Sequence, residues 1–141
     1  MSFNNIADNA VTYAQAFLGR PYKWGGENPI TGWDCSGYIQ EILASVGYDP
    51  KGDQTAQGLY NYFSKQYHIS VPRKGSLAFY GQSENEIKHI AMCINDTQVI
   101  EAAGGNSKTK TIHDAALDNA FVRVRPLMYR SDYLQSLFTF F

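Results

Sequence analysis

The chain has few cysteines and no cluster of basic residues. Its 141 residues include two cysteines, Cys35 and Cys93, which is too few for a disulfide framework and does not form a Cys-x-x-Cys pair. Twelve Lys and Arg residues are balanced by 13 Asp and Glu residues, for a formal charge of −1. The composition therefore argues against the basic surface that nucleic-acid binding requires.

Long apolar runs are also missing. No stretch approaches membrane-spanning length, and the first residues, Met1–Asn5, lack the basic start and apolar core of a signal peptide. We therefore expect no membrane span and synthesis in the cytoplasm without a signal peptide.

What is present is typical of one globular domain spanning residues 1–141. Hydrophobic residues make up 44% of the chain and charged residues 18%, an ordinary balance that argues against disorder. The length is sufficient for a real core and too short for two comfortable domains.

The segment from Arg20 to Val46 organises the chain. Apolar residues at helical spacing predict a helix that starts after the N-cap residue Asp34 and stops at Gly47, with Ile39, Ile42, Leu43 and Val46 on its buried face. Cys35 then lies in the first turn, where free backbone N–H groups and the helix dipole favour the thiolate. Cys35 is therefore a candidate nucleophile; the alternative is a small buried hydrophobe.

Other patterns predict the remaining elements. We expect an N-terminal helix that ends at Gly19, a short helix capped by Thr55 that carries Leu59 and Phe63, and later strands over 76–80, 89–94, 97–102 and 121–125. The buried face of the first helix would hold Ile6, Ala10, Tyr13, Ala14, Phe17 and Leu18. Helices first and strands later indicate an α+β fold with a central antiparallel sheet.

A predicted hairpin brings a histidine and a carboxylate together. An Asn95-Asp96 turn would join the strand that starts at His89 to the strand that ends near Glu101. Glu101 can then orient the His89 imidazole, with Asn106 as the alternative orienting residue. Cys93, in an apolar strand, is predicted to be a buried, inert thiol.

Three segments together resemble the NlpC/P60 family of cysteine peptidases. They are Pro21-Tyr22-Lys23-Trp24-Gly25-Gly26, Asp34-Cys35-Ser36-Gly37 and Lys88-His89-Ile90-Ala91-Met92. Where the family usually has an aspartate after the glycine of a later strand, this chain has Ser76. The resemblance implies a papain-like fold in which N-terminal helices, including the one with the cysteine, pack on a sheet that bears the histidine.

The resemblance also implies a reaction. Cys35 would be the nucleophile, His89 the general base and Glu101 the orienting group of a peptidase that needs no cofactor or metal. His68 and His113 are not expected to be catalytic.

The implied substrate is a peptidoglycan stem peptide, cut at the γ-D-glutamyl–diamino acid amide. Tyr22, Asp34, Ser36 and Trp24 would bind it. For Tyr22 the alternative is an aromatic anchor of the turn, and for Asp34 it is a plain helix cap.

Several routes to the substrate stay open at this point. We expect the chain to act in the cell wall or periplasm as a phage-tail or lysis component, with the aromatic stretch Tyr133–Phe141 either packing on the domain or docking on tail proteins. The alternatives are an injected antibacterial effector with the same chemistry, an acyltransferase or other amide hydrolase on the same scaffold, and a structural tail module.

Overall fold

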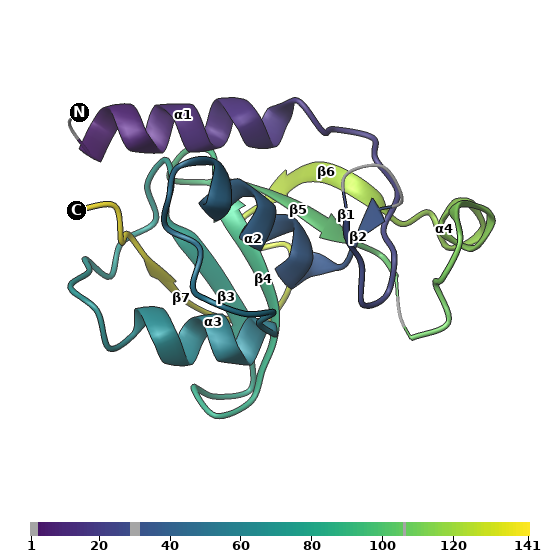
Figure 1. Ribbon diagram of the computed structural model, residues 1–141. Helices are drawn as coiled ribbons and strands as arrows, with labels where there is room; N and C mark the ends of the chain where they lie inside the picture. Colours follow the sequence, from purple (N-terminus) through teal and green to yellow (C-terminus); the bar gives the residue numbers. More distant parts are fainter. Residues whose placement is uncertain (1–2, 29–31, 106) are drawn as a thin grey trace.

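The computed structural model describes residues 3–28, 32–105 and 107–141. The helices are α1 (Phe3–Gln15), α2 (Cys35–Ser45), α3 (Ala56–Phe63) and α4 (Ile112–Asp118). The strands are β1 (Glu27–Asn28), β2 (Gly32–Trp33), β3 (Leu77–Gly81), β4 (Ile87–Cys93), β5 (Gln98–Ala103), β6 (Phe121–Pro126) and β7 (Tyr133–Leu137). Figure 1 shows α1, α2 and α3 stacked beside the main sheet.

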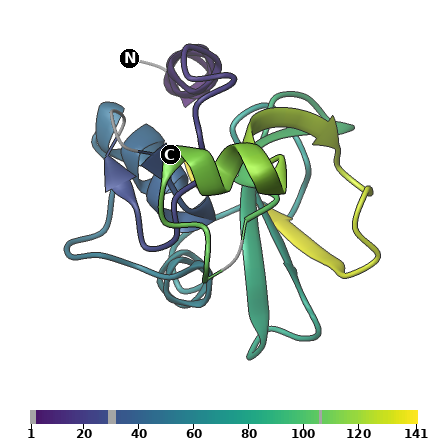
Figure 2. The same cartoon turned by 90° about the vertical axis from the view of Figure 1, so that its right-hand side faces the viewer.

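The main sheet has the strand order β6-β5-β4-β3-β7, with every neighbouring pair antiparallel. Helix α2 packs on β4 and β5, and α1 packs in turn on α2. Figure 2 shows α1 and α2 beside the sheet with α4 nearest the viewer, and Figure 1 shows that α4 lies at one end of the molecule. The predicted α+β fold with a central antiparallel sheet is confirmed.

Helix α2 forms where its apolar spacing predicts it. Its face of Ile39, Ile42 and Leu43 is completely buried. Asp34 is the N-cap residue, and the chain leaves the helix through Gly47, whose φ of +79° suits glycine. The short helix predicted from Thr55 is also present as α3. Both helices that face the cleft are therefore started by local caps.

The first helix is shorter than its pattern predicts. Ala10 and Ala14 are buried as expected, but α1 ends at Gln15 and the chain continues as a turn. Leu18 is 49% exposed, so placing it on the buried face was wrong. Once the chain leaves helical geometry, the 3.6-residue period no longer sets which way a side chain faces.

The aromatic C-terminal stretch packs on the domain. It forms β7 against β3, and Phe138 and Phe140 are completely buried. Phe141 is 45% exposed, and its ring lies 5.4 Å from that of Phe138. Of the two roles left open for this stretch, the structure shows packing on the core.

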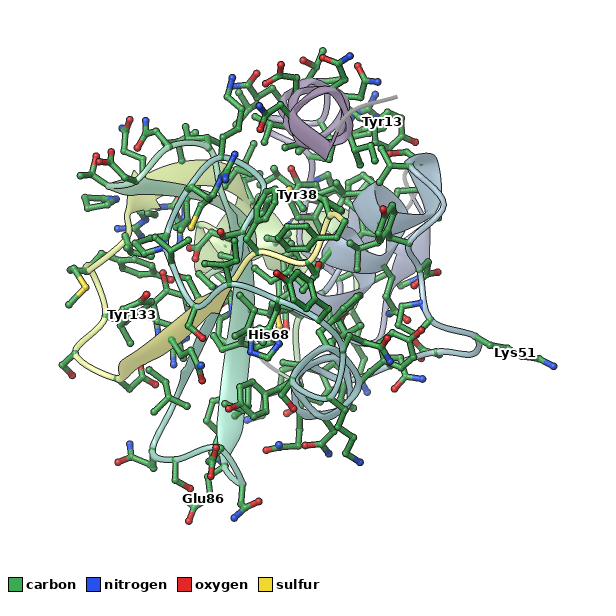
Figure 3. All side chains as sticks on the ribbon, turned by 90° about the vertical axis from the view of Figure 1, so that its left-hand side faces the viewer. Tyr13, Tyr38, Lys51, His68, Glu86 and Tyr133 are labelled. Carbon is green, nitrogen blue, oxygen red and sulfur yellow. The ribbon has the colours of Figure 1, made fainter. Side chains whose placement is uncertain are left out.

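A second, smaller cluster lies on the other face of the sheet. Its buried members are Ala78, Tyr80, Ala91, Cys93, Val99 and Leu127, with Tyr129 and Tyr133 packed against them. The Tyr80 hydroxyl donates to the Leu127 carbonyl at 2.8 Å, which ties β3 to the segment between β6 and β7. Figure 3 shows Tyr133 on this side of the molecule. Within the described residues, no helix is long and apolar enough to cross a membrane.

The burial of Phe140 near the C-terminus predicts that it stabilises the fold. We expect Phe140→Ala to lower the free energy of unfolding by about 3–5 kcal/mol, because truncating a buried Phe removes apolar burial and leaves a cavity. Urea denaturation measures this loss. Phe141→Ala is the matched control and should cost much less, and equal losses for the two variants would contradict the placement of Phe140 in the core.

Candidate active site

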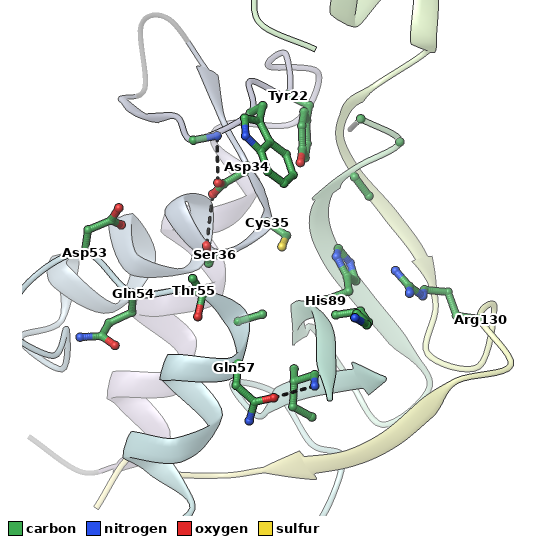
Figure 4. A pocket seen from close by; sticks show the side chains of 18 of the residues that line it. Tyr22, Asp34, Cys35, Ser36, Asp53, Gln54, Thr55, Gln57, His89 and Arg130 are labelled. Carbon is green, nitrogen blue, oxygen red and sulfur yellow. Dashed lines mark hydrogen bonds between the residues drawn. The ribbon is translucent and has the colours of Figure 1, made fainter. Parts of the chain in front are cut away.

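The first turn of α2 presents Cys35 to a cleft of about 740 Å³. Asp34, just before it, is extended (φ −82°, ψ −177°), and its Oδ1 accepts the Gly37 N–H at 2.8 Å. Figure 4 shows the Cys35 side chain pointing toward the strand that carries His89. The sulfur therefore opens onto the cleft from a rigid helix end.

The turn before β1 packs against this helix end. Asp34 Oδ2 accepts the Gly25 N–H at 3.1 Å, and the Asp34 N–H donates to the Gly26 carbonyl at 3.2 Å. A Cβ at Gly37 would lie 2.1 Å from the Gly26 oxygen. Glycine at position 37 is therefore required for this close approach, which explains why the two motifs occur together.

His89 and Glu101 meet on β4 and β5. His89 Nε2 lies 2.8 Å from Glu101 Oε1, and the two residues are 5% and 0% exposed. In the antiparallel pairing of the two strands, Met92 lies opposite Ile100 and Cys93 opposite Val99, so His89 and Glu101 lie beyond the paired segment. Because Nε2 is engaged by the carboxylate, Nδ1 is the ring nitrogen left to face the thiol.

Electrostatics favour a charged imidazole here. Burial lowers the pKa of His89, but hydrogen bonds with Cys35 and Glu101, together with the negative charges of those groups, outweigh it and raise the pKa to about 9. An imidazolium between two anionic partners is the arrangement that stabilises a thiolate.

Tyr129 is a member of the site that the sequence analysis missed. Its hydroxyl lies 2.8 Å from Oε1 and 2.8 Å from Oε2 of Glu101. The two residues are 28 positions apart and belong to no common motif. Nothing in the local pattern around Tyr129 indicates this contact.

Tyr22 and Trp24 lie on the side of the cleft that holds Asp34. Tyr22 is 6% exposed, and burial, followed by the negative charges of Cys35 and Asp34, raises the pKa of its phenol, which therefore stays protonated. A Cβ at Gly105 would meet the Tyr22 ring, so the loop after β5 passes directly over it. Trp24 is 51% exposed at the rim.

Ser36 completes the helix end. It is buried, and its hydroxyl donates to Asp34 Oδ1 at 3.2 Å. Burial raises the pKa of Asp34, whereas the hydrogen bonds from Gly37, Ser36 and Gly25 oppose the rise. Asp34 acts as the helix cap in the structure and also lines the cleft.

The segment before α3 also contributes to the wall of the cleft. Asp53, Gln54 and Thr55 line the cleft there, and Gln57 Oε1 accepts the Ile87 N–H at 2.8 Å, which fixes α3 to the start of β4.

Cationic side chains also line the cleft; they are Lys88, Arg123 and Arg130. The described residues contain no group of three or more His, Cys, Asp or Glu side chains placed to bind a metal ion.

Comparison with known proteins identifies the architecture. The NlpC/P60 family model matches residues 19–126. The chain belongs to the NlpC/P60 family. It is 32% identical over 101 residues to the probable endopeptidase YafL of Escherichia coli, covering 70% of this chain and 40% of that protein.

A second relative and a solved structure are also similar to this chain. The chain is 32% identical over 98 residues to the γ-D-glutamyl-L-lysine dipeptidyl-peptidase of Bacillus cereus, covering 68% of this chain and 28% of that one. The chain thus spans less than half the length of these curated relatives. The crystal structure of the P60 domain of antigen MAP1204 from M. avium subspecies paratuberculosis superposes with a TM-score of 0.71 at 24% identity, over 98% of this chain and 96% of that one.

The remaining candidates lie away from the NlpC/P60 cleft or outside the described residues. His68, labelled in Figure 3, has its Nδ1 2.7 Å from the Gln66 carbonyl oxygen, and His113 is exposed on α4. Cys93 is completely buried, and burial raises the pKa of its thiol to about 12. Asn106, the alternative orienting residue, falls outside the described residues. Of the three predicted catalytic residues, Cys35 and His89 line the cleft, and Glu101 is buried behind His89.

The raised pKa of His89 predicts how stability changes with pH. Since the imidazole binds its proton more tightly in the folded chain, it stabilises the fold fully below its ordinary pKa of 6.5, and this contribution is lost as the pH rises to about 9. We expect the free energy of unfolding to fall by up to about 3 kcal/mol across this window.

Urea denaturation at pH 6, 7.5 and 9 measures the change. The control is His89→Gln, which has no titrating imidazole and should show a flatter dependence. Parallel curves for the two proteins would contradict the raised pKa.

Proposed function

We propose that this chain is a cysteine endopeptidase that hydrolyses peptidoglycan stem peptides. The observation that carries the proposal is the buried His89–Glu101 hydrogen bond of 2.8 Å beside a cysteine at the N-terminus of α2, inside an open cleft. Relatives named endopeptidases support the same chemistry.

The first half of the reaction forms an acyl-enzyme. The Cys35 proton passes to His89 Nδ1, and the thiolate attacks the carbonyl carbon of the scissile amide. The imidazolium then gives its proton to the amide nitrogen, the C–N bond breaks and the amine leaves, with a thioester on Cys35. Glu101 keeps Nε2–H oriented throughout and stabilises the imidazolium.

The second half releases the acid. A water molecule gives a proton to the neutral His89 and attacks the thioester carbon, and the thiolate leaves. In both halves negative charge develops on the carbonyl oxygen, and donors aimed at that oxygen lower the barrier. We assign this role to the Tyr22 phenol, which lines the cleft near Cys35 and stays protonated.

The substrate end that precedes the cut would lie along Tyr22, Asp34 and Ser36. A stem peptide with a free amino terminus places an ammonium there, and the Asp34 carboxylate, which lines the cleft, can accept its hydrogen bonds. Trp24, half exposed at the rim, would cover the same end. The name of the B. cereus relative supports a cut after a γ-D-glutamyl residue.

Delivery to the wall stays a prediction. We retain a phage-tail or lysis-associated enzyme as the expected setting and an injected effector as its alternative. Docking on tail proteins through the aromatic C-terminus loses support, because Phe138 and Phe140 are used in the core. Association of the purified chain with isolated tail proteins, measured by sedimentation, tests the remaining possibility.

Digestion of purified peptidoglycan tests the proposed activity. We expect the wild-type chain to release fragments with new free diamino-acid amino termini, and Cys35→Ala to release none, because the nucleophile is gone. Mass spectrometry of the fragments identifies the bond. The matched control is Cys93→Ala, which removes a buried thiol outside the cleft and should leave cleavage intact.

Two other outcomes would favour one of the alternative functions. Activity on simple acyl esters with none on wall fragments would favour an acyltransferase or another amide hydrolase. A Cys35 thiol that fails to react with alkylating reagents near neutral pH would favour a structural module.

Asp34→Asn tests recognition of the amino terminus. Asn is as good an N-cap residue as Asp, so the helix start should be kept while the charge is lost. The Asn NH2 group cannot accept the Gly25 N–H that Asp34 Oδ2 accepts, and any effect of losing that bond should be the same for every substrate. We expect kcat/KM for a stem peptide with a free amino terminus to fall about 10–100-fold, the value of one charge-assisted hydrogen bond. An N-acetylated peptide is the control substrate; an equal loss on both peptides would refute the ammonium contact.

A further inference from the structure

Glu101 is a carboxylate in an unusually closed environment. It is 0% exposed and sits on the central part of the sheet. A buried carboxylate stays ionised only when nearby donors replace the water it has lost. His89 supplies one donor, to Oε1, and a second is needed for the other side of the group.

Tyr129 supplies it from the segment between β6 and β7. Its hydroxyl is equidistant from both carboxylate oxygens, 2.8 Å from each, so it caps the end of the carboxylate rather than one edge. A hydroxyl has one proton to donate, and either oxygen can receive it without movement of the ring.

The ring of Tyr129 is held from several sides. The Arg125 guanidinium lies over it, 4.9 Å from the ring centre, and the Tyr80 ring lies 6.0 Å away. The Tyr129 N–H donates to the Pro126 carbonyl at 3.1 Å, which closes a turn at the end of β6. The hydroxyl is therefore aimed at Glu101 by its own packing.

We propose that Tyr129 is a positioning residue of the active site, which holds the Glu101 carboxylate directed at His89. The inference rests on the proposed function, since it assigns Tyr129 a part in maintaining the Cys35–His89–Glu101 arrangement. The Tyr129 hydroxyl and the imidazole then hold the carboxylate between them, and the carboxylate in turn holds the imidazole toward the thiol.

Other charged or titratable groups surround the contacts of Glu101 with Tyr129 and His89. Arg123 is the cross-strand neighbour of Glu101, and its Nη1 donates to the Asn119 carbonyl. Arg130 interacts with the Tyr129 hydroxyl and forms a two-bond ion pair with Asp132 at 2.8 Å, and Asp132 interacts electrostatically with His89.

The Tyr80 phenol and the Cys93 thiol complete the surroundings on the sheet. Each has a pKa raised by burial, so both are neutral at neutral pH. The substitution used as a test below leaves all of these groups in place.

The test compares Tyr129→Phe with Tyr133→Phe in the intact chain. Both remove one hydroxyl from the same cluster, but the Tyr133 hydroxyl bonds Ser136 at 2.7 Å and does not contact Glu101. The measurement is the rate of Cys35 alkylation by iodoacetamide from pH 4 to 9, followed by mass spectrometry of the peptide that contains Cys35. This readout needs no substrate.

We expect Tyr129→Phe to move the acid limb of the alkylation profile to higher pH by about one unit, since a hydrogen bond to a charged group is lost. Without the hydroxyl, the Glu101 carboxylate loses one of its two side-chain donors, and it holds the imidazolium and the thiolate less firmly. Alkylation should be about tenfold slower than in the wild type on that limb and equal to it on the plateau. Tyr133→Phe should follow the wild-type curve.

The other outcomes overturn the proposal in different ways. If Tyr129→Phe follows the wild-type curve, or slows alkylation equally at every pH, Tyr129 has a structural role only. If wild-type Cys35 reacts no faster than in His89→Ala, the thiol–imidazole pair itself is absent, and the proposed function fails together with the inference. Thermal unfolding of both Tyr variants checks that any loss of stability is similar.

Discussion

Asp34 accepts hydrogen bonds from Gly25, Ser36 and Gly37. This one carboxylate joins the first turn of α2 to the turn before β1, and it does so next to Cys35. The same side chain accepts one of the free N–H groups of the helix start, that of Gly37, and its bond with Gly25 fixes the turn that carries Trp24 at the rim of the cleft. Since α2 also packs its apolar face on β4 and β5, the sulfur is fixed relative to the sheet that carries the histidine.

The sheet contributes the opposite side of the cleft, where the ionisable side chains of His89 and Glu101 meet. Burying Glu101 would be costly if the carboxylate were unpaired, and the structure meets that cost with donors from two different elements, His89 on β4 and Tyr129 beyond β6. The result is a network in which each group is oriented by its neighbour. Such networks are sensitive to the loss of a single member, because the remaining polar groups stay buried without a partner.

The C-terminal stretch shows how the network is enclosed. Strand β7 pairs with β3 at the edge of the sheet, and Phe138 and Phe140 enter the main core. The segment between β6 and β7 then crosses the other face of the sheet and delivers Tyr129 to Glu101. One aromatic C-terminal region therefore completes the core, and the segment leading into it supports the candidate active site.

The sequence by itself determined the local elements and the choice of candidate reactive groups. Helical spacing, the caps at Asp34 and Thr55 and the hairpin between His89 and Glu101 are short-range features whose signals lie within a few residues. The end of α1, the burial of the C-terminal aromatics and the contact of Tyr129 with Glu101 were decided by the tertiary structure. These depend on segments that lie far apart in the chain and meet only after folding, and no local period or turn motif encodes such a meeting.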